Sequence, residues 1–186
     1  STAINCTFKE NYANGDGGAI YNANAEDCIF IGNSAENCGG GIYNGNATRC
    51  SFTDNNYAGK SGGAIHTGNA TNCNFTDNHA DDDGGAIFKG GAINCTFIGN
   101  KADDHGGAIH HGDEKFTAIN CTFIRNSADE GGATFGIDVI NCIITNNTST
   151  NEGGAIYDAN AVNCTFTGNH AKNSGGAIHT GNAINC

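Results

Sequence analysis

Apolar side chains recur along this chain in two short groups that alternate with a period of about 22 residues. The first group has the form N-C-x-F-x-x-N-x-A, as in residues 5–13, and the second reads G-G-A-I, as in residues 17–20. Cys6 and Phe8 are two residues apart, which places both side chains on one face of an extended strand. A glycine pair in every repeat would cost about 1 kcal/mol per glycine inside a helix. The pattern therefore predicts short strands bounded by turns.

Strands this short cannot bury a face alone, but identical strands stacked in register about 4.8 Å apart can. The sequence therefore predicts an all-β fold, a right-handed parallel β-helix of about eight coils of ~22 residues, with residues 1–186 as one domain. The repeat is already under way at Ser1 and is incomplete at Cys186, so we expect an excerpt of a longer repeat array. Its ends would expose strand edges, for which we expect further coils or end-to-end self-association.

The repeat predicts four columns of inward side chains, made of cysteine, phenylalanine, asparagine and isoleucine. In the G-G-A-I segment, strand alternation predicts that Gly18 and Ile20 point inward and that Ala19 and Tyr21 point outward. The expected structural core consists of a cysteine column and a phenylalanine column: Cys6, Cys28, Cys50, Cys73, Cys95, Cys121, Cys142 and Cys164, with Phe8, Phe30, Phe52, Phe75, Phe97, Phe123 and Phe166. Asparagines expected at the following turn are Asn11, Asn33, Asn55, Asn78, Asn100, Asn126, Asn147 and Asn169. We expect the column cysteines to be buried free thiols, and Cys38, outside the column, to be the most reactive thiol.

A planar side chain follows the isoleucine position of every coil, on the face expected to point outward. This ring strip comprises Tyr21, Tyr43, His66, Phe88, His110, Phe135, Tyr157 and His179. Such rings could form a stacking surface for a sugar or a partner chain, or they could stabilise the sheet by stacking on one another. The histidines of the strip lie in non-adjacent coils, so we expect no metal site there.

Departures from the period mark loops that can carry binding. The largest departure is a bulge at residues 112–117, with Asp113, Glu114, Lys115 and Phe116 as the predicted binding loop. One coil is a residue longer than the others, near residues 57–60. The loops before the glycine pairs are acidic, and stacked carboxylates can hold Ca²⁺. We otherwise expect no cofactor and no metal.

The paired G-G-A-I and F-x-x-N motifs resemble the repeats of polymorphic outer-membrane proteins. They are also similar to adhesin-like surface proteins of methane-producing archaea. Eight copies of each motif carry the resemblance, with Gly41, Thr134 and Ile144 as departures from the consensus. The resemblance implies a β-helix in an extracellular, cell-surface adhesin whose partner is a glycan or protein on a host-cell or microbial surface.

The net charge of the chain limits the kinds of partner that we expect. Nineteen acidic residues against eight Lys and Arg give a net charge of −11. That balance argues against nucleic-acid binding, and no apolar run is long enough for membrane insertion. No catalytic constellation is visible, so we expect a non-enzymatic adhesin-like segment that presents a stiff binding surface. A purely structural stalk is the alternative, and a polysaccharide lyase or hydrolase and an ice-binding Thr/Ile face remain open.

Overall fold

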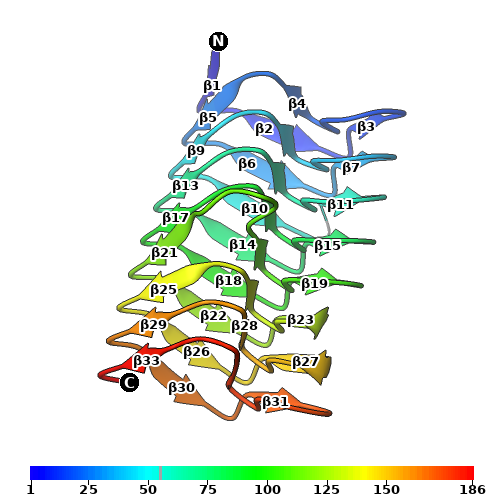
Figure 1. The fold of residues 1–186 in the computed structure, drawn as a ribbon. Helices are drawn as coiled ribbons and strands as arrows, with labels where there is room; N and C mark the ends of the chain where they lie inside the picture. Colours follow the sequence, from blue (N-terminus) through cyan, green and yellow to red (C-terminus); the bar gives the residue numbers. More distant parts are fainter. Residues whose placement is uncertain (55) are drawn as a thin grey trace.

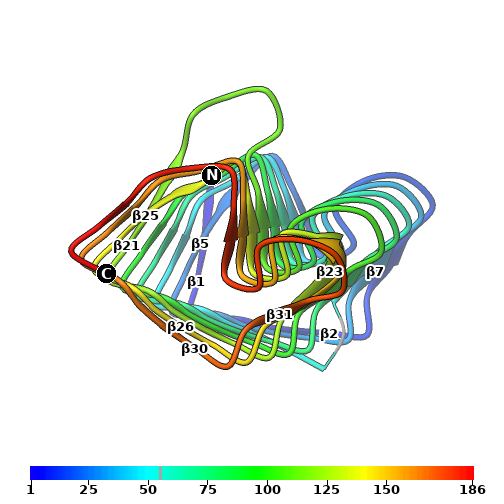
Figure 2. The same ribbon diagram turned by 60° about the horizontal axis from the view of Figure 1, so that its bottom comes forward.

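The computed structural model describes residues 1–54 and 56–186. They form 33 short strands, grouped into four parallel sheets that are stacked coil upon coil (Figure 1). Figure 2, which looks obliquely along the stack, shows that successive coils superimpose closely. The prediction of a parallel β-helix with about eight coils is confirmed. The described residues include no helix long and apolar enough to span a membrane.

Each coil contributes one strand to each sheet, in a fixed order. The first sheet holds β1 (Thr2–Ile4), β5 (Asn24–Glu26), β9 (Ala47–Thr48), β13 (Ala70–Thr71), β17 (Ala92–Ile93), β21 (Thr117–Ile119), β25 (Asp138–Ile140), β29 (Ala161–Val162) and β33 (Ala183–Ile184). The second holds β2 (Thr7–Lys9), β6 (Ile29–Ile31), β10 (Ser51–Thr53), β14 (Asn74–Thr76), β18 (Thr96–Ile98), β22 (Thr122–Ile124), β26 (Ile143–Thr145) and β30 (Thr165–Thr167).

The other two sheets flank the glycine pairs. The third holds β3 (Tyr12–Ala13), β7 (Ser34–Ala35), β11 (Tyr57–Ala58), β15 (His79–Ala80), β19 (Lys101–Ala102), β23 (Ser127–Glu130), β27 (Thr148–Glu152) and β31 (His170–Ala171). The fourth holds β4 (Ile20–Tyr21), β8 (Ile42–Tyr43), β12 (Ile65–His66), β16 (Ile87–Phe88), β20 (Ile109–His110), β24 (Thr134–Phe135), β28 (Ile156–Tyr157) and β32 (Ile178–His179). We number the coils from the cysteine column, so that coil 1 begins at Cys6 and coil 8 at Cys164.

The phenylalanine column forms a continuous stack inside the coil. Phe30 and Phe52 have ring centroids 4.5 Å apart with planes inclined by 7°, and Phe75 and Phe97 are 4.8 Å apart at 3°. Both pairs are fully buried. Offset stacking of this kind adds about 0.5–1.5 kcal/mol per pair to the burial of apolar area.

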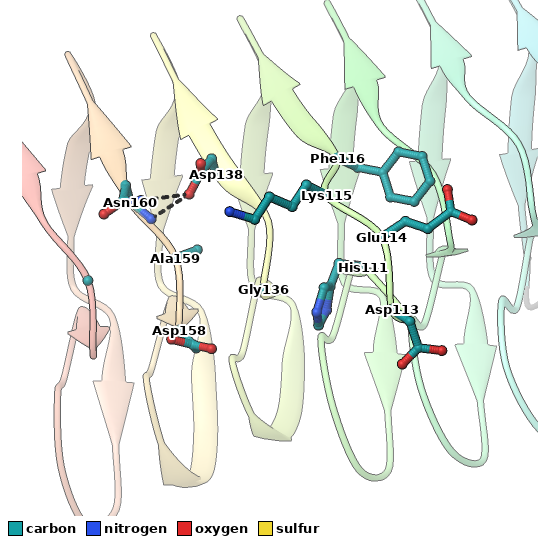
Figure 3. A pocket seen from close by; sticks show the side chains of 11 residues that line it. His111, Asp113, Glu114, Lys115, Phe116, Gly136, Asp138, Asp158, Ala159 and Asn160 are labelled. Carbon is teal, nitrogen blue, oxygen red and sulfur yellow. Dashed lines mark hydrogen bonds between the residues drawn. The ribbon is translucent and has the colours of Figure 1, made fainter.

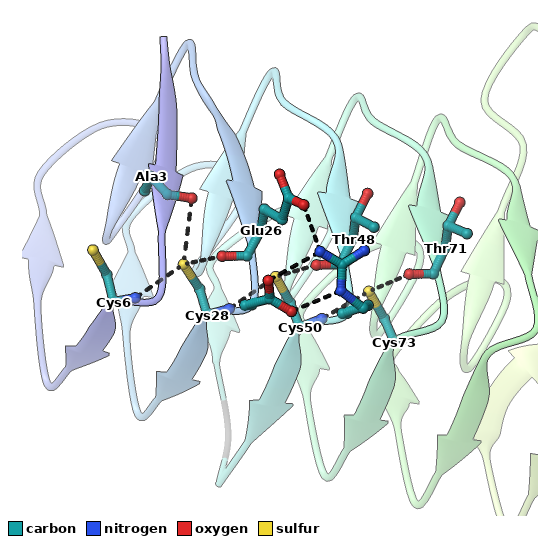
Figure 4. A network of polar contacts seen from close by, with 10 residues as sticks. Ala3, Cys6, Glu26, Cys28, Thr48, Cys50, Thr71 and Cys73 are labelled. Atoms are coloured by element: carbon teal, nitrogen blue, oxygen red, sulfur yellow. Dashed lines mark hydrogen bonds and ion pairs between the residues drawn. The ribbon is translucent and has the colours of Figure 1, made fainter.

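The cysteine column runs beside these rings (Figure 4). All ten cysteines are free thiols, and the seven from Cys28 to Cys164 in the column are buried, whereas Cys6 and Cys186 are exposed. Each thiol of the column donates to the carbonyl two residues before it, as Cys28 Sγ does to Glu26 O at 3.1 Å. The backbone N–H of Cys28 donates in turn to Cys50 Sγ at 3.4 Å. The sulfur therefore meets part of the backbone's hydrogen-bonding demand at the corner between two sheets.

A buried asparagine ladder closes the corner after the phenylalanine strand. The side-chain amide of Asn100 donates to Asn126 Oδ1 at 3.0 Å and to Phe75 O at 3.0 Å. The prediction placed Asn55 in this ladder, but Asn55 lies outside the described residues and Asn56 occupies the ladder position, with its Nδ2 donating to Asn78 Oδ1 at 2.8 Å. Tyr57 pairs in register with Ser34 and His79 of the neighbouring coils in the third sheet. The residue by which coil 3 exceeds the period therefore comes before Asn56, and its predicted position near residues 57–60 was wrong.

The alanines of G-G-A-I were predicted to point outward, and this was wrong. Ala86 is fully buried, together with its equivalents in coils 3 to 7 that carry alanine. The N–H groups of Ala86 and Ile87 both donate to the carbonyl of Ala108, at 3.0 and 2.9 Å. Two successive residues that share one acceptor form a bulge, and a bulge breaks the alternation of faces. Alanine and isoleucine therefore both face the core.

Backbone geometry at two corners of the coil explains the residue before each column cysteine and the glycine pair. The residue before each column cysteine has a left-handed backbone, as in Asn94 with φ 53°, which is a conformation that asparagine tolerates. Gly84 has φ 64°, and a Cβ on Gly85 would lie 2.2 Å from the carbonyl oxygen of Gly107. The glycine pair is therefore required both for its backbone angle and for the close approach of the next coil.

Candidate binding surface

The ring strip is one continuous stack. All seven neighbouring pairs are stacked, with centroid distances between 4.8 and 5.2 Å, from Tyr21–Tyr43 to Tyr157–His179. Tyr21 at the first coil is 58% exposed, whereas His110 in the middle of the stack is only 8% exposed. The structure therefore brings all eight predicted residues together, but it leaves most of them half-buried.

A second column covers one side of the ring strip. It consists of the residue before each glycine pair, and it contains Asp16, Cys38, Ser61, Asp83, His105, Glu130, Glu152 and Ser174. The ring of His105 lies 4.8 Å from that of Phe135, and His179 Nε2 lies 3.4 Å from Glu152 Oε2. This pre-glycine column thus lines the ring strip with carboxylates. We call the third sheet and the segments that join it to the fourth sheet, as in residues 79–86 and 101–108, the acidic lobe. The acidic residues of the loops before the glycine pairs lie in this lobe, and Asp16, Asp83, Glu130 and Glu152 among them belong to the pre-glycine column.

Cys38 is a member of this column and is half-buried. Burial raises the pKa of its thiol above the ordinary range, and the neighbouring carboxylate of Asp16 adds to that shift. A raised pKa lowers the thiolate fraction at neutral pH, which slows reaction. The structure therefore gives no support to the expectation that Cys38 is unusually reactive.

The centre of the lobe holds a small hydrogen-bonded cluster. Asp83 Oδ1 lies 2.7 Å from His105 Nδ1, and His105 Nε2 lies 3.8 Å from Glu130 Oε2. The hydrogen bond to Asp83 raises the pKa of His105, while burial lowers that of His110 to about 4. His110 Nδ1 accepts the backbone N–H of Gly112 at 2.9 Å, so neutral His110 carries its proton on Nε2.

The bulge predicted at residues 112–117 leaves the outline of the coil, as the green loop in Figure 2. Its last residue, Thr117, begins β21. Asp113, Glu114 and Lys115 are exposed, whereas Phe116 is half-buried and packs against the core. Lys89 Nζ in the preceding coil lies 3.8 Å from Asp113 Oδ2. The bulge is thus anchored at both ends and displays three charged side chains.

Several cavities border the bulge, and two of them are lined by both Lys115 and Phe116. The larger of these two, of about 370 Å³, lies between the bulge and the next three coils, and its lining includes Lys115, His111, Asp138, Asp158 and Asn160 (Figure 3). In Figure 3 the Lys115 side chain extends toward Asp138, while the Phe116 side chain extends in the opposite direction. The smaller, of about 280 Å³, lies beneath Phe116 and includes Ile93 and Ile119 of the first sheet. His111 Nδ1 is buried without a hydrogen-bond partner among the described residues.

Sequence reasoning missed the far wall of the larger cavity. Asp138 and Asn160 belong to an outer ladder in which Asn160 N donates to Asp138 Oδ1 at 2.8 Å and Asn182 N donates to Asn160 Oδ1 at 3.1 Å. The same ladder runs from Asn24 to Asn46 and Asn69 on the other side of the bulge. The repeated N-A letters at this position were a visible signal. Gly91 and Thr117 hold the ladder position in the two coils before Asp138, so the ladder is interrupted next to the bulge.

Sequence reasoning offered the acidic loops as possible Ca²⁺ ligands, but it missed that histidines join their carboxylates in two groups of potential metal ligands. The ligand atoms of Asp83, His105 and His110 lie within 4.8 Å of one another, and so do those of His79, Asp81 and Asp103. Only His110 belongs to the ring strip, whereas the other two histidines lie in the acidic lobe. Comparing histidines within the ring strip alone could not detect either group.

Comparison with known families agrees with the repeat structure. The model of the Chlamydia polymorphic membrane protein repeat matches residues 5–23, 27–45, 72–88, 94–112, 141–159 and 163–181, which together make up more than half of the chain. The unmatched segments contain most of coils 3 and 6. Coil 3 is one residue longer than the 22-residue period, whereas coil 6 is one residue shorter and has Thr134 in the isoleucine position. No curated protein matches the chain. The similarity to archaeal adhesin-like proteins stays a prediction. The chain belongs to the Chlamydia polymorphic membrane protein repeat family.

Proposed function

We propose that this chain is a non-enzymatic, adhesin-like repeat segment that is displayed on the outside of a cell and binds a surface glycan or protein. The family is one of surface membrane proteins, which supports display at a cell surface. A stack of eight coils is stiff, because every coil is fixed to the next by four parallel strand pairs. Many weak contacts along such a rod can add up to firm attachment.

One observation carries the proposal. The described coils share one cross-section, and the marked departure from it is the bulge at residues 112–117 with a cavity on each side. The inner columns account for the rest of the repeat by packing alone. Asp138, Asp158 and Asn160 offer acceptors and donors to hydroxyl or amide groups, and the exposed Lys115 adds a positive charge. A partner of the rod would therefore bind beside the bulge.

The experiment compares this chain with a variant lacking residues 113–116, which restores the spacing of the other coils. Beads coated with either protein are tested for attachment to cells and to a glycan array. We expect the intact chain to bind and the deletion variant to lose most of that binding with an unchanged circular dichroism spectrum. A chain that binds nothing in either assay would be a structural stalk, and equal binding by both proteins would place the contact elsewhere.

A further inference from the structure

Three potential metal ligands converge on the outer face of the acidic lobe. His79 lies on β15, Asp81 follows it by two residues on the same face, and Asp103 lies directly after β19 in the next coil. His79 Nε2 is 3.3 Å from Asp103 Oδ1 and 3.9 Å from Asp81 Oδ1. The three side chains are 28%, 49% and 43% exposed in the order His79, Asp103, Asp81, so an ion can reach them from solvent.

These separations suit a small transition-metal ion. Imidazole nitrogen and carboxylate oxygen bind Zn²⁺ at about 2.0–2.2 Å, so two ligands of a tetrahedral site lie roughly 3.3–3.6 Å apart. The two measured separations bracket this value within a few tenths of an ångström. A nitrogen ligand and only two carboxylates favour Zn²⁺ and its neighbours, whereas Ca²⁺ requires six to eight oxygen ligands.

Tyr57 in coil 3 orients two of the ligands. Its hydroxyl donates to Asp81 Oδ2 at 2.5 Å, which leaves Oδ1 directed toward His79. Its ring meets the imidazole of His79 edge-on, with centroids 5.6 Å apart and planes inclined by 63°. Hydrogen bonds that fix the unused oxygen of a ligating carboxylate are typical of the outer shell of metal sites.

The second group of potential ligands is a weaker candidate. Neutral His110 accepts a backbone N–H at Nδ1 and therefore carries its proton on Nε2, so it has no free lone pair for a metal. Asp83 is already hydrogen-bonded to His105 Nδ1. In the group formed by His79, Asp81 and Asp103, His79 Nε2 is also hydrogen-bonded to Asp103 Oδ1, at 3.3 Å. Its Nδ1 has no hydrogen-bond partner among the described residues, so the neutral ring can carry its proton there and offer the Nε2 lone pair to a metal. A competing cation is Lys101, whose Nζ lies 2.5 Å from Asp103 Oδ1.

We propose that His79, Asp81 and Asp103 bind a divalent transition-metal ion, with Zn²⁺ as the best match and water completing the coordination. Because Asp103 belongs to coil 5 and the other two ligands to coil 4, the ion joins adjacent coils. It displaces the ammonium group of Lys101 from Asp103. Such binding adds a stabilising contact that depends on the concentration of the metal.

Titration of the untagged, reduced chain with Zn²⁺ and with Co²⁺ tests this site. We expect one tight equivalent of either metal and no comparable binding of Ca²⁺ or Mg²⁺. His79→Gln and Asp103→Asn should each weaken binding at least tenfold, and Tyr57→Phe should weaken it about tenfold. Lys101→Gln should tighten it, because it removes the competing cation. Bound Co²⁺ should show visible bands without sulfur charge-transfer absorption, which separates this site from the cysteines.

Asp82→Asn and Asp104→Asn are matched controls, since each removes one charge from the same lobe at an exposed position. Equal weakening by these controls would reduce the effect to diffuse attraction by carboxylates and overturn the proposal. So would an unchanged affinity in His79→Gln, a loss of binding in His105→Gln alone, or no binding of either metal. A metal-dependent rise in the unfolding temperature that is absent in His79→Gln gives an independent readout.

Discussion

Asn78 donates two hydrogen bonds to a single atom of Asn100. Its backbone N–H lies 3.1 Å and its side-chain Nδ2 lies 2.9 Å from Asn100 Oδ1. Asn78 is 1% exposed and Asn100 is fully buried. The same double contact joins Asn100 to Asn126, so each amide serves as acceptor for one neighbour and donor for the other.

Replacing Asn100 by Asp should therefore be costly. A carboxylate cannot donate to Asn126 Oδ1 or Phe75 O, and it would face both of these oxygens without an intervening proton. Removing the donor from a buried hydrogen bond costs about 1–3 kcal/mol. We expect a loss of about 2–4 kcal/mol in the free energy of unfolding, measured by urea denaturation. Asn94→Asp is the matched control, because Asn94 makes a similar amide contact, to Asn72 at 3.2 Å, on the exposed outer corner. Equal losses in the two variants would contradict a special role for the buried ladder.

Thr134 interrupts the buried isoleucine column at some cost. It is fully buried, and its Oγ1 has no hydrogen-bond partner among the described residues. Thr134→Val keeps the shape and removes the unpaired hydroxyl, which should stabilise the chain by about 1 kcal/mol. The midpoint of thermal unfolding measures this. Thr122→Val, at a half-buried position of the second sheet, should change it little, and a destabilised Thr134→Val variant would refute the argument.

His66 should make stability depend on pH. Burial lowers its pKa from the ordinary 6.5 to about 4, against a smaller opposing effect of Asp16. The neutral ring is thus favoured in the fold, and its contribution is complete above pH 6.5 and lost as the pH falls from 6.5 toward 4. His66→Phe preserves the stack between Tyr43 and Phe88 without a titrating group.

Urea midpoints at pH 7.5 and pH 4.5 compare the two proteins. We expect the wild-type chain to lose more stability over this interval than the His66→Phe variant. His105, whose pKa is raised, acts in the opposite direction, because its contribution is present below pH 6.5 and lost as the pH rises through its folded pKa. That term is common to both proteins and cancels in the comparison. Parallel curves would show that His66 does not titrate differently in the fold.

The cysteines should divide into accessible and protected groups. Cys6 and Cys186 are exposed, Cys38 is half-buried, and the other seven are buried. A thiol-labelling reagent should therefore modify two cysteines quickly, one slowly, and seven only after unfolding. Mass spectrometry of the native and denatured chains counts them. Labelling of nine or ten thiols in the native state would contradict a closed core.

The sequence predicted which residues form the columns of the coil, but it did not predict the local backbone hydrogen bonding that decides which side chains face the core. The 22-residue period and the spacing of Cys6 and Phe8 predicted the coils and the buried columns of the inner coils, because strand alternation holds there. The prediction was wrong for Cys6, which is exposed at the end of the stack, and Phe8 and Phe166 in the two outermost coils are only partly buried. It failed at Ala86, where two N–H groups share one carbonyl and the alternation is broken. It failed again at Asn55, because one inserted residue can be placed on either side of a turn. Period alone carries no information on such local hydrogen bonding.

The candidate site was predicted only in part for a related reason. The bulge was visible as four extra residues, but its cavity depends on Asp138 and Asn160 in later coils. The ring strip was visible too, but its covering depends on the loop that returns before each glycine pair. His79 and Asp103 are 24 residues apart, and only the register of β15 with β19 shows that they meet.

Backbone donors of one coil find their acceptors in the adjacent coil with the same offset from coil to coil, as Ile65 does with Ala86 and Ile87 with Ala108. The upper and lower faces of a coil are therefore interchangeable between copies. Deleting or duplicating one whole period in the gene would rejoin matching faces without any compensating substitution. Lineages could thus change the reach of this molecule by copy number, and edit its bulge independently of its length.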